Sequence, residues 1–97
     1  MIDFEFGPAS DALFRAMLTL ETVEDCERFF RDLCTLSELH ALTERWQVVL
    51  KLQEGLPYRT IAEQTGVSTA TITRVSHWLQ HGEGGYQLAL NRLDQDG

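Results

Sequence analysis

The stretch LPYRTIAEQTGVSTATITRVSHWLQ, residues 56–80, is the most informative part of this chain about its fold. Its spacing is that of a helix-turn-helix, in which two short helices cross steeply and are joined by a tight turn that often contains glycine. The pattern predicts helices at about 58–65 and 68–81. Gly66 is expected to end the first helix in a left-handed conformation, which costs glycine little. Ser68 is expected to cap the second helix by accepting from its free N–H groups.

Apolar and small residues of this stretch meet the packing demands of two crossing helices. The expected packing residues are Ile61, Ala62, Gly66, Val67, Ile72 and Val75. Ala62 stands where the two helices approach closely, so a large side chain there would push them apart. Ile72 and Val75, three residues apart, bury the second helix. Thr65 departs from the pattern, because an apolar residue is usual at its position.

The other face of the second helix carries short hydroxyls and a methyl group, which allow close approach to DNA. Threonine can donate to a phosphate or a base, and methyl groups can contact thymine methyls. Arg59 is placed to reach a phosphate or a guanine. The predicted DNA-binding residues are Arg59, Ser68, Thr69, Ala70, Thr71, Thr73 and Arg74. The alternative is that the Ser and Thr side chains only cap the helix or lie exposed.

Hydrophobic periodicity predicts helices in the rest of the chain, and no window has the alternation of a strand. We therefore expect an all-α fold in a single domain, residues 1–97. Within it, the N-terminal helices of 8–54 would form a dimer core, 57–81 the helix-turn-helix, and 86–94 a C-terminal helix. The amphipathic helices before residue 35 exceed what a helix-turn-helix needs for support, which favours a second subunit as their partner. The alternative is that they pack on their own domain.

The 97 residues carry a net charge of −7, and this charge is uneven. Residues 1–40 hold nine acidic residues and three arginines, whereas 56–81 hold only Arg59, Glu63 and Arg74 as charged groups. The helix-turn-helix is thus slightly basic and the acidity is N-terminal. Since much affinity for bulk DNA comes from basic residues that neutralise phosphates, we expect weak non-specific binding.

Nothing in the sequence indicates a membrane span or a signal peptide, so we expect a cytoplasmic protein. Cys26 and Cys34 are too far apart along one helix for a disulfide, which fits a reducing compartment. Both lie in apolar stripes that are typical of inert buried thiols.

The run from Gly66 to Arg74, GVSTATITR, resembles the recognition helix of the Trp repressor superfamily. The resemblance extends over roughly residues 35–93, through Ala41, Leu42 and Gly55 at matching spacing. It implies an intertwined homodimer whose two recognition helices enter successive major grooves of a pseudo-palindromic operator. This geometry places the two half-sites of the operator about one helical turn of DNA apart. The protein would then be a transcriptional regulator, expected to be a repressor.

The resemblance also implies a tryptophan corepressor, but the pocket residues depart from the family pattern. One of two family arginines matches Arg74, whereas the other falls on Gln47, which cannot pair with a carboxylate as a charged fork does. A family glycine that makes room for the indole falls on Val75, and a phosphate-binding lysine falls on Ala62. We interpret Gln47, Arg74 and Val75 as the remnant of an effector pocket. The chain resembles a branch of the superfamily that lacks the tryptophan pocket, and its corepressor, if one exists, is unknown.

The remaining groups of histidine and tryptophan side chains favour structural roles. His77 and His81 lie four apart with only Glu83 nearby, which falls short of a zinc ligand set, so no metal site is predicted. Trp46 and Trp78 are expected in the core. No catalytic arrangement or phosphate-binding loop stands out, so neither enzymatic activity nor a cofactor is expected.

Two alternatives to the DNA-binding regulator remain. The helix-turn-helix fold can serve as a protein–protein interaction module that does not bind DNA, which the charge of −7 keeps open. A similar fold occurs in sigma-factor DNA-binding domains, which the two N-terminal helices argue against.

Overall fold

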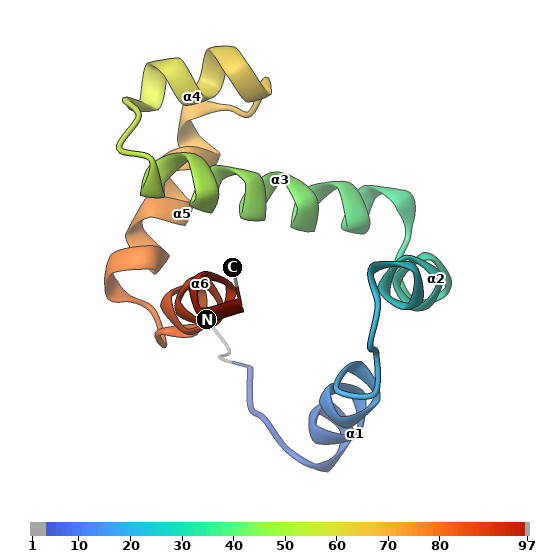
Figure 1. The fold of residues 1–97 in the computed structure, drawn as a ribbon. Helices are drawn as coiled ribbons and strands as arrows, with labels where there is room; N and C mark the ends of the chain where they lie inside the picture. The colour runs from blue at the N-terminus through green and yellow to red at the C-terminus, as the bar shows by residue number, and fades with distance from the viewer. Residues whose placement is uncertain (1–3, 97) are drawn as a thin grey trace. The chain divides into compact units, whose positions relative to one another are not determined.

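The computed structural model describes residues 4–96, and this range consists of six α-helices without a strand (Figure 1). The helices are α1 (Pro8–Met17), α2 (Val23–Leu33), α3 (Leu36–Gln53), α4 (Tyr58–Thr65), α5 (Thr69–His81) and α6 (Gly85–Asp96). The predicted all-α fold class is confirmed. Contacts divide the chain into two units, residues 1–39 and 40–97.

Side-chain caps set the starts of α2 and α3. The hydroxyl of Thr22 accepts from the N–H of Asp25 at 3.0 Å, and the Asp25 carboxylate accepts from the N–H of Glu21 at 3.1 Å. Before α3, the Thr35 N–H donates to the Glu38 carboxylate at 2.8 Å, while the Thr35 hydroxyl accepts from the Glu38 N–H at 3.1 Å. These reciprocal bonds satisfy N–H groups that have no partner inside a helix.

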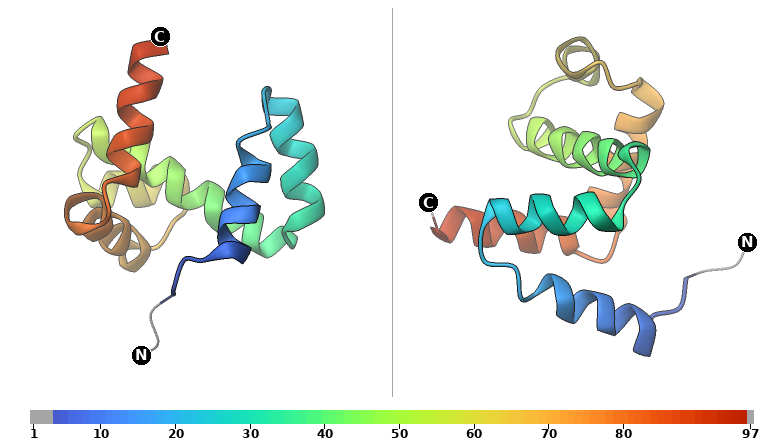
Figure 2. Two further views of the ribbon diagram at one scale, coloured as in Figure 1. Left: turned by 90° about the horizontal axis from the view of Figure 1, so that it is seen from below. Right: turned by 90° about the vertical axis from the view of Figure 1, so that its right-hand side faces the viewer.

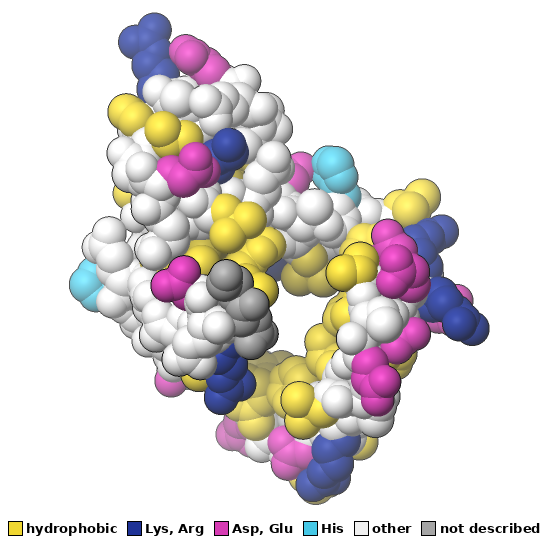
Figure 3. Space-filling view, viewed as in Figure 1, with side chains coloured by type: hydrophobic (Ala, Val, Ile, Leu, Met, Phe, Trp, Pro, Cys, Tyr) yellow, Lys and Arg dark blue, Asp and Glu magenta, His cyan; other side chains and the backbone are white. Residues whose placement is uncertain are grey.

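The apolar side chains of the first unit are largely exposed. Neither α1 nor α2 has a buried residue. The exposed large side chains are Phe4, Phe6, Phe14, Leu18, Val23, Leu33 and Leu36. Hydrophobic side chains accordingly appear on the molecular surface (Figure 3). The expected burial of Cys26 is wrong for the single chain, because the apolar stripe of α2 is not covered there and this thiol is exposed.

The second unit has a small core built by three helices and one turn. Figure 2 shows the ribbon of these helices from two further sides. Val48 and Val49 from α3 pack with residues of the helix-turn-helix, and Tyr86 and Leu90 of α6 lie partly buried against the same cluster. The core members are Val48, Val49, Ile61, Val67, Ile72 and Val75. Trp46 also packs against them, but the expected burial of Trp78 is wrong, since 54% of this residue is exposed.

The last helix is longer than the sequence predicts. α6 runs over Gly85–Asp96 rather than 86–94. The N–H of Leu88 donates to the carbonyl of Gly84 at 3.0 Å, so the first turn closes one residue earlier. The polar residues after 94 continue the helix to Asp96, and Gly97 lies outside the described residues. No helix within residues 4–96 is long and apolar enough to cross a membrane.

Candidate nucleic-acid interface

The turn between α4 and α5 is fixed by backbone geometry and by a cap. Gly66 has φ 75°, in the left-handed region, and its N–H donates to the carbonyl of Ala62 at 2.9 Å. Because residues with a side chain rarely adopt this conformation, a glycine can end α4 here at little cost. Ser68 then caps α5, since its hydroxyl accepts from the N–H of Thr71 at 3.2 Å.

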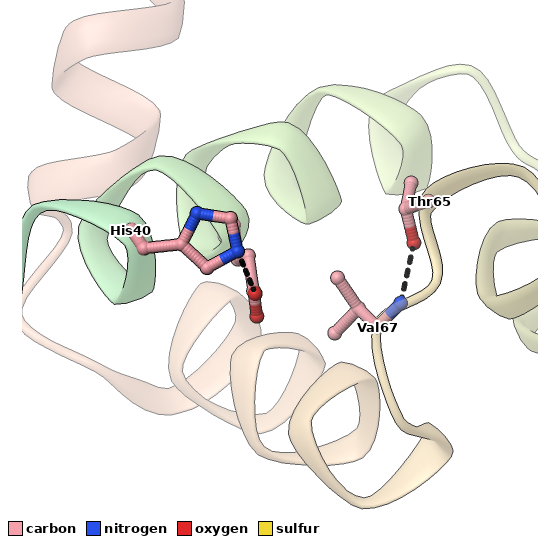
Figure 4. A network of polar contacts seen from close by, with 4 residues as sticks. His40, Thr65 and Val67 are labelled. Carbon is pink, nitrogen blue, oxygen red and sulfur yellow. Dashed lines mark hydrogen bonds and ion pairs between the residues drawn. The ribbon is translucent and has the colours of Figure 1, made fainter. Parts of the chain in front are cut away.

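Thr65 links the end of α4 to the turn with one hydroxyl. This hydroxyl donates to the carbonyl of Ile61 at 2.6 Å. It also accepts from the N–H of Val67 at 3.1 Å, and this second contact is drawn in Figure 4. A threonine therefore meets a demand of the turn that an apolar residue would leave unmet, because the buried Val67 needs a partner for its N–H.

Figure 4 also shows His40 on α3, whose Nε2 lies 3.0 Å from the carboxylate of Glu44.

The packing face of the helix-turn-helix lies in the core of the second unit. Ile61, Val67, Ile72 and Val75 are all buried. Ala62 is half-buried and packs against this cluster. The spacing of these residues places the opposite face of α5 in solvent.

That opposite face is made of short side chains. Ser68, Thr69, Ala70, Thr73 and Arg74 are exposed, and Thr71 is half-buried. The Thr73 hydroxyl donates to the carbonyl of Thr69 at 2.9 Å, so its lone pairs remain as acceptors. The Ser68 hydroxyl donates to that of Thr71 at 3.1 Å, which leaves the Thr71 proton to donate outward. The face thus offers both a donor and an acceptor at close range.

Arg59 projects from the first turn of α4. Its ion pair with Glu63 is open to solvent, with side chains 91% and 70% exposed and 3.6 Å between Nε and the carboxylate. Exposed pairs of this kind contribute at most about 1 kcal/mol. The guanidinium can therefore exchange the carboxylate for a phosphate, but Glu63 competes with that phosphate for its charge.

A polar contact that sequence reasoning missed ties α4 to α5. The Tyr58 hydroxyl donates to the hydroxyl of Ser76, which is only 5% exposed, at 2.5 Å. Gln80 also donates to Ser76, at 3.4 Å. The signal was present, because Ser76 follows Ile72 by four residues and so falls on the apolar face, where a buried polar group needs a partner.

The three residues interpreted as an effector-pocket remnant lie in different environments. Val75 is 2% exposed and belongs to the core, whereas Gln47 on α3 and Arg74 on α5 are exposed. The branched side chain of Val75 is therefore part of the core packing. The rings of His77 and His81 have centroids 5.1 Å apart, but no group of three metal-ligating side chains occurs in the described part of the chain.

Comparisons with a family model and with individual proteins agree on one family. Residues 9–94 match the sequence model of the Trp repressor protein family. The uncharacterised protein YerC of Bacillus subtilis is 44% identical over 94 residues, which are 97% of this chain and 90% of YerC. A Trp operon repressor homolog of Chlamydia trachomatis is 40% identical over 72 residues, 69% of this chain and 77% of that protein.

Two crystal structures have the same fold. One is a Staphylococcus aureus protein assigned to the Trp repressors, which is 46% identical with a TM-score of 0.87 and covers 92% of this chain and 89% of its own. The other is a TrpR-like protein from Eubacterium eligens, 42% identical with a TM-score of 0.84 over 89% of each chain.

Proposed function

The chain belongs to the Trp repressor protein family, and from this premise we propose that it is a sequence-specific DNA-binding transcriptional regulator that acts as a repressor. It binds a pseudo-palindromic operator as a homodimer in the cytoplasm, without control by tryptophan. The recognition helix is α5. Arg59 and Arg74 contact phosphate or guanine, and Ser68, Thr69, Ala70, Thr71 and Thr73 approach the base edges.

The observation that carries this proposal is the contrast between the two faces of α5. One face is locked into the core by Ile72 and Val75, and by the bond from Tyr58 to Ser76. The other face presents hydroxyls and a methyl group close to the capped N-terminus. Short polar side chains at the start of a rigidly held helix suit direct contact with base edges in the major groove.

The exposed apolar side chains of α1 and α2 support the homodimer. Val23 is 72% exposed, and the neighbouring large side chains of this unit are exposed as well. Contiguous exposed apolar surface is typical of interaction sites. A second copy would cover this surface and set the two recognition helices about one turn of DNA apart.

Independence from tryptophan follows from Val75 and Gln47. Val75 fills core space, so an indole has no room where its side chain packs. Gln47 brings no charge toward a ligand carboxylate. With the core closed in this way, α4 and α5 stay in one arrangement without a corepressor.

Electrophoretic retardation over a series of salt concentrations tests the proposal. The expected result is retardation of operator-containing DNA whose affinity falls steeply with salt, because phosphate contacts release counterions. Isothermal calorimetry on the same preparation should detect no saturable tryptophan binding. The assignment to DNA would be overturned if no genomic fragment were retarded, or if the retardation did not depend on salt.

A protein–protein interaction module is the second candidate. The net charge of −7 favours it, because it opposes approach to phosphate. Under this alternative a pull-down recovers a specific protein that contacts Thr71 and Thr73, and no salt-dependent DNA affinity is found.

A further inference from the structure

A pocket of about 540 Å³ lies in the second unit, behind the helix-turn-helix. The end of α3, the loop to α4, the start of α4, the buried side of α5 and the first turns of α6 all contribute to its wall. This volume falls in the range of small-molecule sites. Its residues are separate from Gln47, Arg74 and Val75, so it is not the effector-pocket remnant described above.

Hydroxyl groups at the pocket wall are held in fixed positions. Ser76 is almost fully buried, and its oxygen accepts from Tyr58 and from Gln80. Because the Tyr58 proton is directed to Ser76, the lone pairs of the Tyr58 oxygen remain as acceptors. The Gln80 amide uses one N–H in this contact and retains a second N–H and its carbonyl oxygen.

Two further amides complete the polar wall. Gln53 at the end of α3 and Gln87 in the first turns of α6 both line the pocket and are exposed. A glutamine side chain presents a donor and an acceptor side by side, which matches the N6 and N7 edge of adenine. The described residues that line the pocket include no charged side chain.

The remaining wall is apolar. Leu52, Leu56 and Leu79 line it together with Tyr58. The lining therefore combines three leucines with a larger set of polar side chains, and it opens to solvent where Gln53, Gln80 and Gln87 are exposed. The absence of a cation among the described lining residues disfavours ligands that carry a carboxylate or a phosphate, because such a charge would lack a partner.

We propose that this pocket binds an uncharged purine base or purine nucleoside. The amides of Gln53, Gln80 and Gln87 hydrogen-bond the edge of the ring, and the leucine side chains cover its faces. Such a ligand contacts α4 and α5 at once, so it fixes the helix-turn-helix against α3 and α6. An effect of this ligand on DNA affinity depends on the proposed function, whereas the binding of the ligand to the pocket does not.

Calorimetry and thermal melting of the full chain with adenine, adenosine, guanosine, cytidine and uridine test this site. We expect saturable binding of a purine at one ligand per chain, with a rise in melting temperature because the ligand binds only the folded state. Gln53→Leu and Gln87→Leu should each weaken binding by about tenfold or more. Gln95→Leu, at an exposed glutamine on the same helix as Gln87, is the control and should bind as wild type.

Two results would overturn the site. One is that none of the five compounds binds saturably, or that only the pyrimidine nucleosides do. The other is that Gln53→Leu and Gln87→Leu bind as tightly as Gln95→Leu. Because ligand binding is measured without DNA, a failure of DNA retardation alone would contradict only the proposed function.

Discussion

The hydroxyl oxygen of Thr65 lies 3.1 Å from the backbone nitrogen of Val67 and accepts its N–H across the turn of the helix-turn-helix. The same hydroxyl donates to Ile61 one turn back in α4. Thr65→Val keeps the shape of the side chain but removes both bonds, which should lower the free energy of unfolding by about 1–3 kcal/mol because a buried N–H is left without its partner. Thr65→Ser keeps the hydroxyl and should be closer to wild type in a urea titration. Equal midpoints for the valine and serine variants would contradict this role.

Ala62 should tolerate no large side chain. It is half-buried and packs against the core where α4 and α5 meet. Ala62→Leu is expected to destabilise the fold by about 1–3 kcal/mol through overpacking. Ala70→Leu makes the same change at an exposed position of α5 and should leave the melting curve near wild type. An unchanged curve for Ala62→Leu would contradict the close approach of the two helices.

Thr71 and Thr73 should matter for DNA and not for folding. Thr71→Ala and Thr73→Ala each remove a hydroxyl from the outward face of α5, and losing one neutral hydrogen bond costs about 0.5–1.5 kcal/mol of binding free energy. Fluorescence anisotropy with operator DNA should show the weaker binding, while light scattering and circular dichroism stay as in wild type. Wild-type affinity in both variants would remove α5 from the interface.

The pair of Arg59 and Glu63 should set the salt dependence of DNA binding. Glu63→Gln removes the carboxylate 3.6 Å from the guanidinium and should raise DNA affinity. Arg59→Ala should reduce the slope of log affinity against log salt by about 0.9 for each phosphate that is no longer neutralised. Arg92→Ala on α6 removes an equal charge away from α4 and serves as the control. Equal slopes for the two arginine variants would place Arg59 outside the interface.

Glu38 should make the start of α3 sensitive to acid. The backbone N–H of Thr35, followed by its side-chain hydroxyl, holds the pKa of Glu38 below its ordinary value of 4.5. A carboxylate with a lowered folded-state pKa adds stability that is present above its unfolded pKa and is lost as the pH falls through the folded pKa. Nuclear magnetic resonance titration of the carboxyl group should therefore give a midpoint below 4.5, and Thr35→Val should raise it. A midpoint at or above the ordinary value in the wild-type chain would contradict the capping interaction.

Local sequence patterns predict most of the fold. Gly66 and the capping residue Ser68 act through neighbours within four positions, so the sequence alone predicts what they do. The end of α6 was less predictable, because polar residues that suit a frayed tail also suit an exposed helix.

Interactions between segments that lie far apart in the sequence could not be predicted from it. The bond from Tyr58 to Ser76 spans 18 positions, and only the folded crossing of α4 and α5 brings the two hydroxyls together. The exposure of Trp78 has a similar cause, since its helical spacing favours burial but the core lies on another side of α5. The face of α5 could be predicted from the sequence, but the pocket behind it could not.

Operator recognition without tryptophan can be tested by selecting bound fragments from genomic DNA with the purified chain, in the presence and absence of tryptophan. One pseudo-palindromic sequence with half-sites about one helical turn apart should be enriched equally in both conditions. Enrichment only with tryptophan would contradict the roles given to Gln47 and Val75. Failure to enrich any sequence in either condition would contradict the assignment of α5 to DNA.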